Sequence, residues 1–456
     1  MNDEKSTSGD RPEDPLADWL RQLGLGGGGE LDLPAMLSQL QQAMSVMAPG
    51  ANSGELDWTQ ARHAVRQVVA SLGTDRTMDA QDQRLVADAD RLAVLWLDPN
   101  VDFTAPVSTP QAWSRAEWVE QTMDSWQEIV APVISRLANA LADSFSSQFS
   151  GVQDMPADFA HFAKLLTPML RGAAGQLYAM QLSQAIGRTA SQVVSGSELG
   201  LQVLPRAQVV LLPTNVAAFA AGLGVSAEDV RLYLAVRENA RQRLFGQVGW
   251  LGPQLLALVE HYAREITIDV SALTDAIDAE DVHSMSPERL SQLSEQLQGR
   301  LFMPIQTKEQ LEIIGRLETL IALVEGWVDE VTSTTLGKWM PQAAPLLDEA
   351  IRRRRATDNP GQQLFSALLG MDLRPRRVRD AANLWAALTR DRGVSGRDAV
   401  WAHPDLMPTA DDLDDPLRVL DEQPSSANDD LDIALAELLA QAERERRDLG
   451  GDQPKE

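Results

Sequence analysis

The stretch that decides the fold runs from Val230 to Trp250 and reads Val-Arg-Leu-Tyr-Leu-Ala-Val-Arg-Glu-Asn-Ala-Arg-Gln-Arg-Leu-Phe-Gly-Gln-Val-Gly-Trp. Its apolar residues recur every three or four positions, which predicts a helix with one buried face. The expected buried stripe consists of Leu232, Val236, Ala240 and Leu244. Arg237, Glu238 and Arg241 lie beside that stripe. The pattern therefore predicts a helix that carries charged side chains close to the protein core.

Outside this stretch, the composition excludes several classes of function. The chain has 456 residues, a formal net charge of -26 and no cysteine. So acidic a chain repels phosphate, which argues against a general nucleic-acid binder or a protein that binds anionic membranes. The lack of cysteine excludes disulfides, thiolate catalysis and cysteine-based metal sites.

The sequence also carries no sign of membrane insertion or export. No apolar run approaches the ~20 residues that a membrane-spanning helix needs. The acidic N-terminus lacks the charge pattern of a signal peptide. We therefore expect a cytoplasmic protein with no membrane span, whose partners are proteins or peptides and not nucleic acids.

Helical periodicity in almost every segment predicts a mainly α fold with at most a small β element. The best strand candidate lies between Gln202 and Pro213, with a small sheet expected near Val209 to Leu212 because this run is short, apolar and bounded by prolines. Three tryptophans at core spacing should anchor the first helices: Trp113, Trp118 and Trp126. The long helices are expected over residues 58–72, 81–97, 115–141 (kinked at Pro132), 158–166, 176–194, 281–302 and 308–332.

The chain is expected to divide into four regions. Residues 1–55 form a flexible leader with short helices, and residues 407–456 form an acidic tail with one helix at about 431–447. Both ends have too little apolar area to offset the entropy of ordering them. Residues 56–199 should form a helical bundle, and residues 200–406 a second helical region that contains the Val230 to Trp250 stretch.

Arg237, Glu238 and Arg241 have the spacing of the metallopeptidase motif His-Glu-x-x-His. In that motif two imidazoles one helical turn apart hold zinc, and the glutamate beside the first acts as a general base. Here arginine stands at both imidazole positions. The five histidines of the chain include no pair at the i, i+4 spacing, so no two histidines can hold a metal from one helical turn. His261 and Glu265 do have that spacing, which is typical of a solvated helix face.

Two clusters of arginine stand out in this acidic chain, at Arg352 to Arg355 and between Arg374 and Arg379. Exposed aromatic residues and a basic surface, which nucleic-acid binding requires, do not accompany them. We interpret these clusters as a surface of salt bridges that neutralises carboxylates or binds an acidic partner.

Five segments together resemble the zincin-like metallopeptidase type 2 family, whose members are also described as hydrolases or zinc-dependent metalloproteases and which has a sister branch associated with coenzyme F420 biosynthesis. They are Leu211-Leu-Pro-Thr-Asn-Val, Val236-Arg-Glu-Asn-Ala-Arg-Gln-Arg-Leu-Phe, Leu320-Ile-Ala-Leu-Val-Glu-Gly-Trp-Val-Asp, Leu373-Arg-Pro-Arg-Arg and Trp401-Ala-His-Pro-Asp-Leu. The resemblance covers most of the chain and implies a zincin-like helical region over 200–406. The resemblance implies that Glu238 stands at the position of the family's general base. It also implies that Glu325 stands at the position of a third metal ligand, which is a carboxylate. Arg237 and Arg241 fall at the two histidine positions.

Arginine at those two positions changes the chemistry of the site. A guanidinium has no lone pair to give to a metal and remains charged at any accessible pH. We therefore expect Arg237 or Arg241 to lie within salt-bridge distance of Glu238 or Glu325 and to replace the positive charge of a metal. The first hypothesis for function is a zincin-type protein without metal or activity, which keeps the fold as a scaffold for protein interactions. The second is a hydrolase that retains zinc, with Glu238 as base and ligands such as Glu325 and His261.

Overall fold

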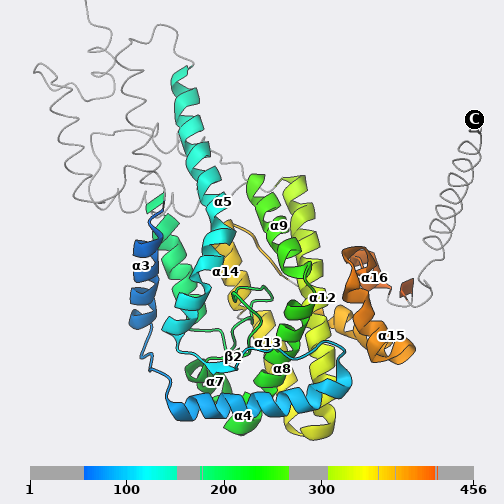
Figure 1. The fold of residues 1–456 in the computed structure, drawn as a ribbon. Coiled ribbons are helices and arrows are strands. Elements are labelled where there is room, and N and C mark those ends of the chain that lie inside the picture. The colour runs from blue at the N-terminus through cyan, green and yellow to red at the C-terminus, as the bar shows by residue number, and fades with distance from the viewer. Residues whose placement is uncertain are drawn as a thin grey trace, which may run out of the picture.

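The structure is a computed structural model that describes residues 56–150, 175–265 except 177, 307–415 except 358 and 375, and 418–419. Helices account for nearly all of the regular structure in these residues (Figure 1). The strands among them are β1 (Gln111–Ala112) and β2 (Val210–Leu211). The prediction of a mainly α fold with a small β element is confirmed.

Helix α8 (Ala227–Gln247) is buried over most of its length. It begins at Ser226, whose side-chain oxygen accepts a hydrogen bond from the backbone N–H of Asp229 at 3.0 Å. Every residue from Leu232 to Phe245 is buried. The sequence predicted one buried face, but neighbouring elements cover this helix on all sides. Charged side chains on such a helix need partners, since an unpaired buried charge costs several kcal/mol.

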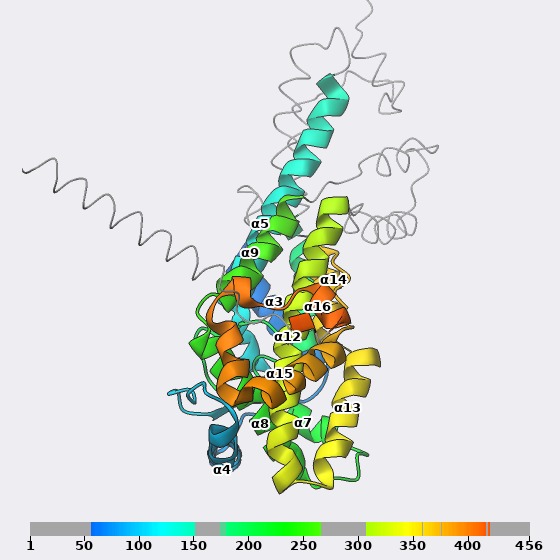
Figure 2. The same cartoon turned by 90° about the vertical axis from the view of Figure 1, so that its right-hand side faces the viewer.

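Those neighbours come from distant parts of the sequence. Helix α4 (Ala80–Leu97) and helix α12 (Lys308–Trp339) both pack against α8. Helix α12 in turn packs against α9 (Leu251–Arg264) and α15 (Val378–Ala399). Helix α13 (Ala343–Thr357) contacts both α8 and α12, and Figure 2 shows α13 and α15 beside α12. This packing places α8 and α12 face to face.

The first part of the chain adds a second group of helices. Helix α3 (Trp58–Ser71) packs against α5 (Arg115–Ser150), and α5 packs against α9. Helix α5 continues beyond the predicted end at residue 141 and contains Pro132. Trp113, Trp118 and Trp126 are buried, as predicted.

The remaining helical elements are short. They are η2 (Asp98–Asn100), a helical segment over residues 178–190, α7 (Pro213–Ala220), α14 (Pro360–Leu369), η4 (Val400–Ala402), η5 (Pro404–Leu406) and α16 (Ala410–Asp414). Helix α14 begins after Asn359, whose side chain accepts hydrogen bonds from the backbone N–H groups of Gly361 and Gln362. Helix α15 contains a break that was not predicted, at Gly393, where φ is +72° and the backbone leaves the helical region.

The small sheet holds a loop against α8. Strands β1 and β2 pair in parallel, with Gln111 opposite Val210 and Ala112 opposite Leu211. Leu211 also bridges Ser195 in the antiparallel sense, and β2 contacts α8. The position of β2 agrees with the prediction, whereas its partner β1 was not predicted. The sheet thereby fixes residues 195–197 next to the buried charges of α8.

One cluster of buried apolar side chains runs through both predicted central regions. It includes Trp118 and Ile186 from residues 56–199, and Val236 and Trp327 from residues 200–406. The division at residue 199 remains a prediction. The predictions for residues 1–55, 158–166, 281–302 and 431–447 lie outside the described residues. Within the described ranges, no helix is both long enough and apolar enough to cross a membrane.

Candidate functional site

Arg241 of α8 joins the two carboxylates that the sequence singled out. Its Nε lies 2.8 Å from Glu325 Oε1 and its Nη2 lies 3.0 Å from Glu325 Oε2, so the contact is bidentate. Its Nη1 lies 3.1 Å from Glu238 Oε2. Glu325 belongs to α12, 84 positions along the chain from Arg241. The predicted contact between these two helices is confirmed.

Arg237 lies one turn earlier on α8 and binds the same face of α12. Its Nη1 lies 2.6 Å from Asp329 Oδ1, and its Nη2 lies 3.3 Å from Glu325 Oε2. Glu325 and Asp329 are four positions apart, so their side chains project from the same face of the helix. Two arginines of α8 therefore meet two carboxylates of α12.

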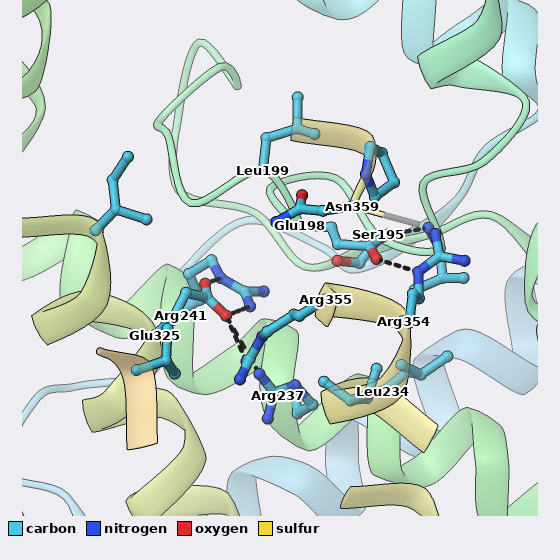
Figure 3. Close-up of a pocket in the computed structure, with 15 residues that line it drawn as sticks. Ser195, Glu198, Leu199, Leu234, Arg237, Arg241, Glu325, Arg354, Arg355 and Asn359 are labelled. Carbon is cyan, nitrogen blue, oxygen red and sulfur yellow. Dashed lines mark hydrogen bonds and ion pairs between the residues drawn. The ribbon is translucent and has the colours of Figure 1, made fainter. Parts of the chain in front are cut away.

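Arg355 of α13 completes this group. Its Nη2 lies 2.9 Å from Glu325 Oε2, and its Nη1 lies 2.6 Å from Asp329 Oδ2. We call the six residues the arginine–carboxylate cluster: Arg237, Arg241, Arg355, Glu238, Glu325 and Asp329. Figure 3 shows the three arginines directed toward Glu325. With every member ionised, three positive charges balance three negative charges.

Glu238 is fully buried, and its carboxylate is surrounded by donors. Ser195 Oγ donates to Oε2 at 2.8 Å, and the Ser197 N–H donates to Oε1 at 3.2 Å. The Ser197 hydroxyl lies 2.9 Å from Oε1 and 3.0 Å from Oε2, and Gln242 Nε2 donates to Oε1 at 3.0 Å. Together with Arg241, these groups occupy both carboxylate oxygens. Glu238 has no exposed surface.

The loop that supplies the two serines depends on Gly196. A Cβ there would lie 2.9 Å from Leu204 Cδ1, 3.0 Å from Val210 Cβ and 3.3 Å from Glu238 Oε1. Only glycine lets this loop approach α8 so closely. Sequence reasoning missed Ser195 and Ser197, because a Ser-Gly-Ser triplet has no specific pattern. It also did not distinguish Arg355 from the other three arginines in its run.

Burial and the neighbouring arginines shift the pKa values of the three carboxyl groups of the cluster in opposite directions. Burial alone would raise the pKa of Glu325, but attraction by Arg241, Arg355 and Arg237 outweighs burial and lowers it overall. The pKa of Asp329 is lowered in the same way by Arg355 and Arg237. For Glu238, burial raises the pKa above its ordinary value, and Arg241 and the hydrogen bonds offset this only in part.

A small cavity of about 60 Å³ lies beside the cluster (Figure 3). Ser195, Arg237, Arg241, Glu325 and Arg355 contribute to its wall, whereas Glu238 does not. The volume suits a few water molecules, because one water needs about 10 to 15 Å³ by this measure. The proposed base is therefore separated from this cavity by its neighbours.

The residues present do not fit a zinc ion. Zinc binds through lone pairs of nitrogen, sulfur or oxygen, and Arg237 and Arg241 offer none. Both oxygens of Glu325 already accept hydrogen bonds from arginines. The cluster thus lacks the donor set of a zincin site.

His261, considered as an unorthodox ligand, is not near the cluster. Its Nε2 lies 3.7 Å from Glu309 Oε1, and Glu309 precedes Glu325 by sixteen positions on α12. At 1.5 Å per residue this separates the two glutamates by about 24 Å. The structure therefore does not bring His261 and Glu325 together. Ligand atoms of His261, Glu265 and Glu309 do lie within 4.8 Å of one another, in a partly exposed group of a kind common on acidic surfaces.

Comparison with known proteins agrees with this fold. Residues 56–419 match the family described as zincin-like metallopeptidase. No curated protein sequence matches the chain. A crystal structure from Chloroflexus aurantiacus, described as "a putative hydrolase with a novel fold", aligns with a TM-score of 0.54 and 18% identity. The alignment covers 80% of this chain and 98% of that one, and at this identity it concerns the fold. Because the family match spans most of the chain, the protein belongs to the zincin-like metallopeptidase family.

Proposed function

We propose that this protein is a non-catalytic member of its family, which uses the zincin-like fold to bind a protein or peptide. In this proposal the arginine–carboxylate cluster takes the place of the zinc centre. The observation that supports it most directly is the contact of Arg241, at a metal-ligand position of the motif, with both Glu238 and Glu325. The cytoplasm is the compartment that the acidic, cysteine-free sequence favours.

Charge balance explains how such a replacement can preserve the fold. Two neutral histidines with one Zn²⁺ carry a charge of +2, and Arg237 with Arg241 carries the same charge. The carboxylates around the site therefore keep an equal opposing charge when the metal is replaced. Removing the metal without this compensation would leave buried carboxylates unpaired, which is strongly destabilising.

The surroundings of Glu238 also support a structural role. A general base needs a free lone pair directed at the proton that it removes. The two oxygens of Glu238 instead accept hydrogen bonds from Ser195, Ser197 and Gln242. Glu238 also forms an ion pair with Arg241. These contacts position the loop of residues 195–197 on α8.

A retained hydrolase is the second candidate, and one observation favours it. Burial raises the pKa of Glu238, which is typical of a carboxylate that accepts and releases protons in catalysis. The same shift arises wherever a carboxylate is buried for structural reasons. The separation of His261 from Glu325 leaves this candidate without its suggested metal ligands.

Elemental analysis of the purified full-length protein tests the proposal. After growth in zinc-supplemented medium and dialysis, we expect far less than one zinc ion per chain. We also expect no casein hydrolysis above that of a Glu238→Gln variant prepared in parallel. One zinc ion per chain, or hydrolysis that the Glu238→Gln variant lacks, would favour the hydrolase instead.

A further inference from the structure

An open cleft of about 910 Å³ lies next to the arginine–carboxylate cluster. Residues of helices α8, α12, α13, α14 and α15 line it, together with the segment that precedes α15. Figure 2 shows α13 and α15, two of these helices, beside α12. Arg237, Asp329 and Arg355 of the cluster also line the cleft. Its volume is in the range of clefts that bind ligands larger than a single ion.

The wall of this cleft carries more arginines than acidic residues. Arg376 and Arg379 line it and are exposed. Across the described ranges, the side chain of neither residue forms a hydrogen bond or an ion pair, although the charge of Arg376 is close enough to attract the carboxylates of Glu318 and Asp372. Arg374 and Arg352 also line the cleft, and each has one surface carboxylate as partner, Asp372 and Glu349.

Three acidic residues also line the cleft: Asp329, Glu330 and Asp348. Within the described residues Glu330 has no arginine or lysine partner, and its Oε1 accepts a hydrogen bond from the Thr334 hydroxyl at 3.0 Å. Asp329 is paired with Arg237 and Arg355. Asp348 accepts a hydrogen bond from the Tyr233 hydroxyl at 2.7 Å, and burial raises its pKa above the ordinary value. Six arginines against three acidic residues leave this cleft with an excess of positive charge, in a protein whose formal net charge is -26. Such a local reversal of charge attracts an anionic ligand at short range, where the screening length is about 8 Å.

We propose that this cleft binds an acidic peptide segment whose carboxylates pair with Arg376 and Arg379. This inference rests on the proposed function as a peptide-binding module and names the class of peptide. The exposed side chains of Ser333 and Asn383 line the same cleft and can hydrogen-bond to the peptide backbone. A peptide fits better than a small anion, because arginines of α13 line the cleft as well as those at the start of α15, and the cleft far exceeds the volume of one phosphate.

Fluorescence anisotropy on the full-length protein tests this proposal. The probe is a labelled dodecapeptide of alternating glutamate and serine, and the comparison peptide has glutamine in place of glutamate. We expect binding of the acidic peptide only. The double variant Arg376→Glu with Arg379→Glu should weaken it by about tenfold or more, from two lost ion pairs and the new repulsion.

The control variant makes the same change of charge elsewhere. Arg206 and Arg316 are exposed and do not line the cleft, so Arg206→Glu with Arg316→Glu should leave the affinity within about twofold. Binding to the wild type should also weaken as sodium chloride is raised, which requires no variant to fold. Equal losses in both double variants, or an affinity insensitive to salt, would overturn the proposal.

Other ligands are distinguished in the same assay. Competition by inorganic phosphate or oligothymidylate at concentrations where the glutamine peptide has no effect would show a phosphate site, and the peptide proposal would be wrong. If the acidic peptide fails to bind and the protein contains no zinc, the inference about the cleft is wrong, but the proposal of a non-catalytic protein is not contradicted. A stoichiometric zinc content would instead contradict the proposed function, whatever the peptide does.

Discussion

At the scale of single residues, Glu325 is the carboxylate of the cluster that pairs with the most arginines. Arg237, Arg241 and Arg355 all reach its carboxylate, from two different helices. Each arginine is nearly or largely buried, so none of these ion pairs is exposed to the screening that makes surface pairs weak. Such a group is stable as a whole and costly to leave incomplete, because the remaining buried charges then have no partner.

Arg241→Ala is therefore expected to lower the free energy of unfolding by about 3 to 5 kcal/mol. The substitution leaves Glu238 and one edge of Glu325 without their shared cation. Urea denaturation followed by circular dichroism measures the loss. Arg206→Ala, an exposed control, should change stability by less than about 0.5 kcal/mol. A loss for Arg241→Ala no larger than that of the control would contradict the account.

Glu325→Gln is expected to show how the cluster depends on pH. The pKa of Glu325 in the folded protein is lower than in the unfolded chain, because the attraction of the arginines outweighs burial. Its stabilising effect is therefore complete above the unfolded pKa of about 4.3 and is lost as pH falls through the folded pKa. The stability difference between wild type and Glu325→Gln should be constant from pH 7 to about pH 5 and should shrink below about pH 4. A difference that grows on acidification would have the wrong sign.

Sequence reasoning identified part of the cluster. The spacing of Arg237, Glu238 and Arg241 and the family resemblance of the Glu325 segment predicted the meeting of α8 and α12. The role of Arg355 was not predicted, because its run offers four equivalent arginines and the structure alone shows which of them reaches Glu325. A local sequence pattern does not show which side chains of two separate helices meet.

At the scale of elements, the position of α12 matters most, since it carries Glu325 and Asp329 between α8 and α15. Gly326 allows α15 to approach closely at this point. A Cβ on Gly326 would lie 2.6 Å from Ala381 Cβ and 2.7 Å from the Ala382 backbone nitrogen. These are backbone and short side-chain atoms that cannot swing aside.

Gly326→Ala should accordingly destabilise the protein by about 1 to 3 kcal/mol, through the shift forced between α12 and α15. Gly315→Ala is the matched control on the same helix, because a Cβ there would meet no atom of another described element within 4 Å. At that position the higher helix propensity of alanine should stabilise by up to about 1 kcal/mol. Thermal denaturation of the two variants compares them directly, and equal effects would show that the close approach has no cost.

Periodicity predicted most helices well but could not predict their surroundings. Helix α8 was expected to have one buried face, yet residues Leu232 to Phe245 are buried on every side. Strand β1 was missed, since two residues carry no detectable alternation. The break at Gly393 was missed as well, because an isolated glycine near the end of a helical pattern does not by itself show a left-handed backbone.

At the scale of the whole molecule, one apolar core connects regions that the sequence suggested were separate. Helix α4 packs on α8, and α5 packs on α9, across the predicted boundary at residue 199. Ion pairs cross it too, since Arg354 lies 2.9 Å from Glu198. A shared core makes it costly to unfold one region while the other remains intact.

We therefore expect residues 56–199 and 200–406 to unfold in one cooperative transition. Tryptophan fluorescence reports on both regions through the buried Trp118 and Trp327, and far-ultraviolet circular dichroism reports on the helices. The two signals should give coincident curves in urea. Two separated transitions, with different midpoints for the two probes, would show independent domains.

The replacement of a metal centre by arginine is the central claim, and zinc titration of Arg237→His with Arg241→His tests it most directly. Two imidazoles one turn apart on α8 together with Glu325 would supply three ligands and leave one position open. The control is Arg237→Gln with Arg241→Gln, which removes the same charges without adding imidazoles. The account predicts that the double histidine variant binds one zinc ion per chain, measured by competition with a chelator, while the wild type and the glutamine control bind none. A double histidine variant that binds zinc no better than the glutamine control would contradict it.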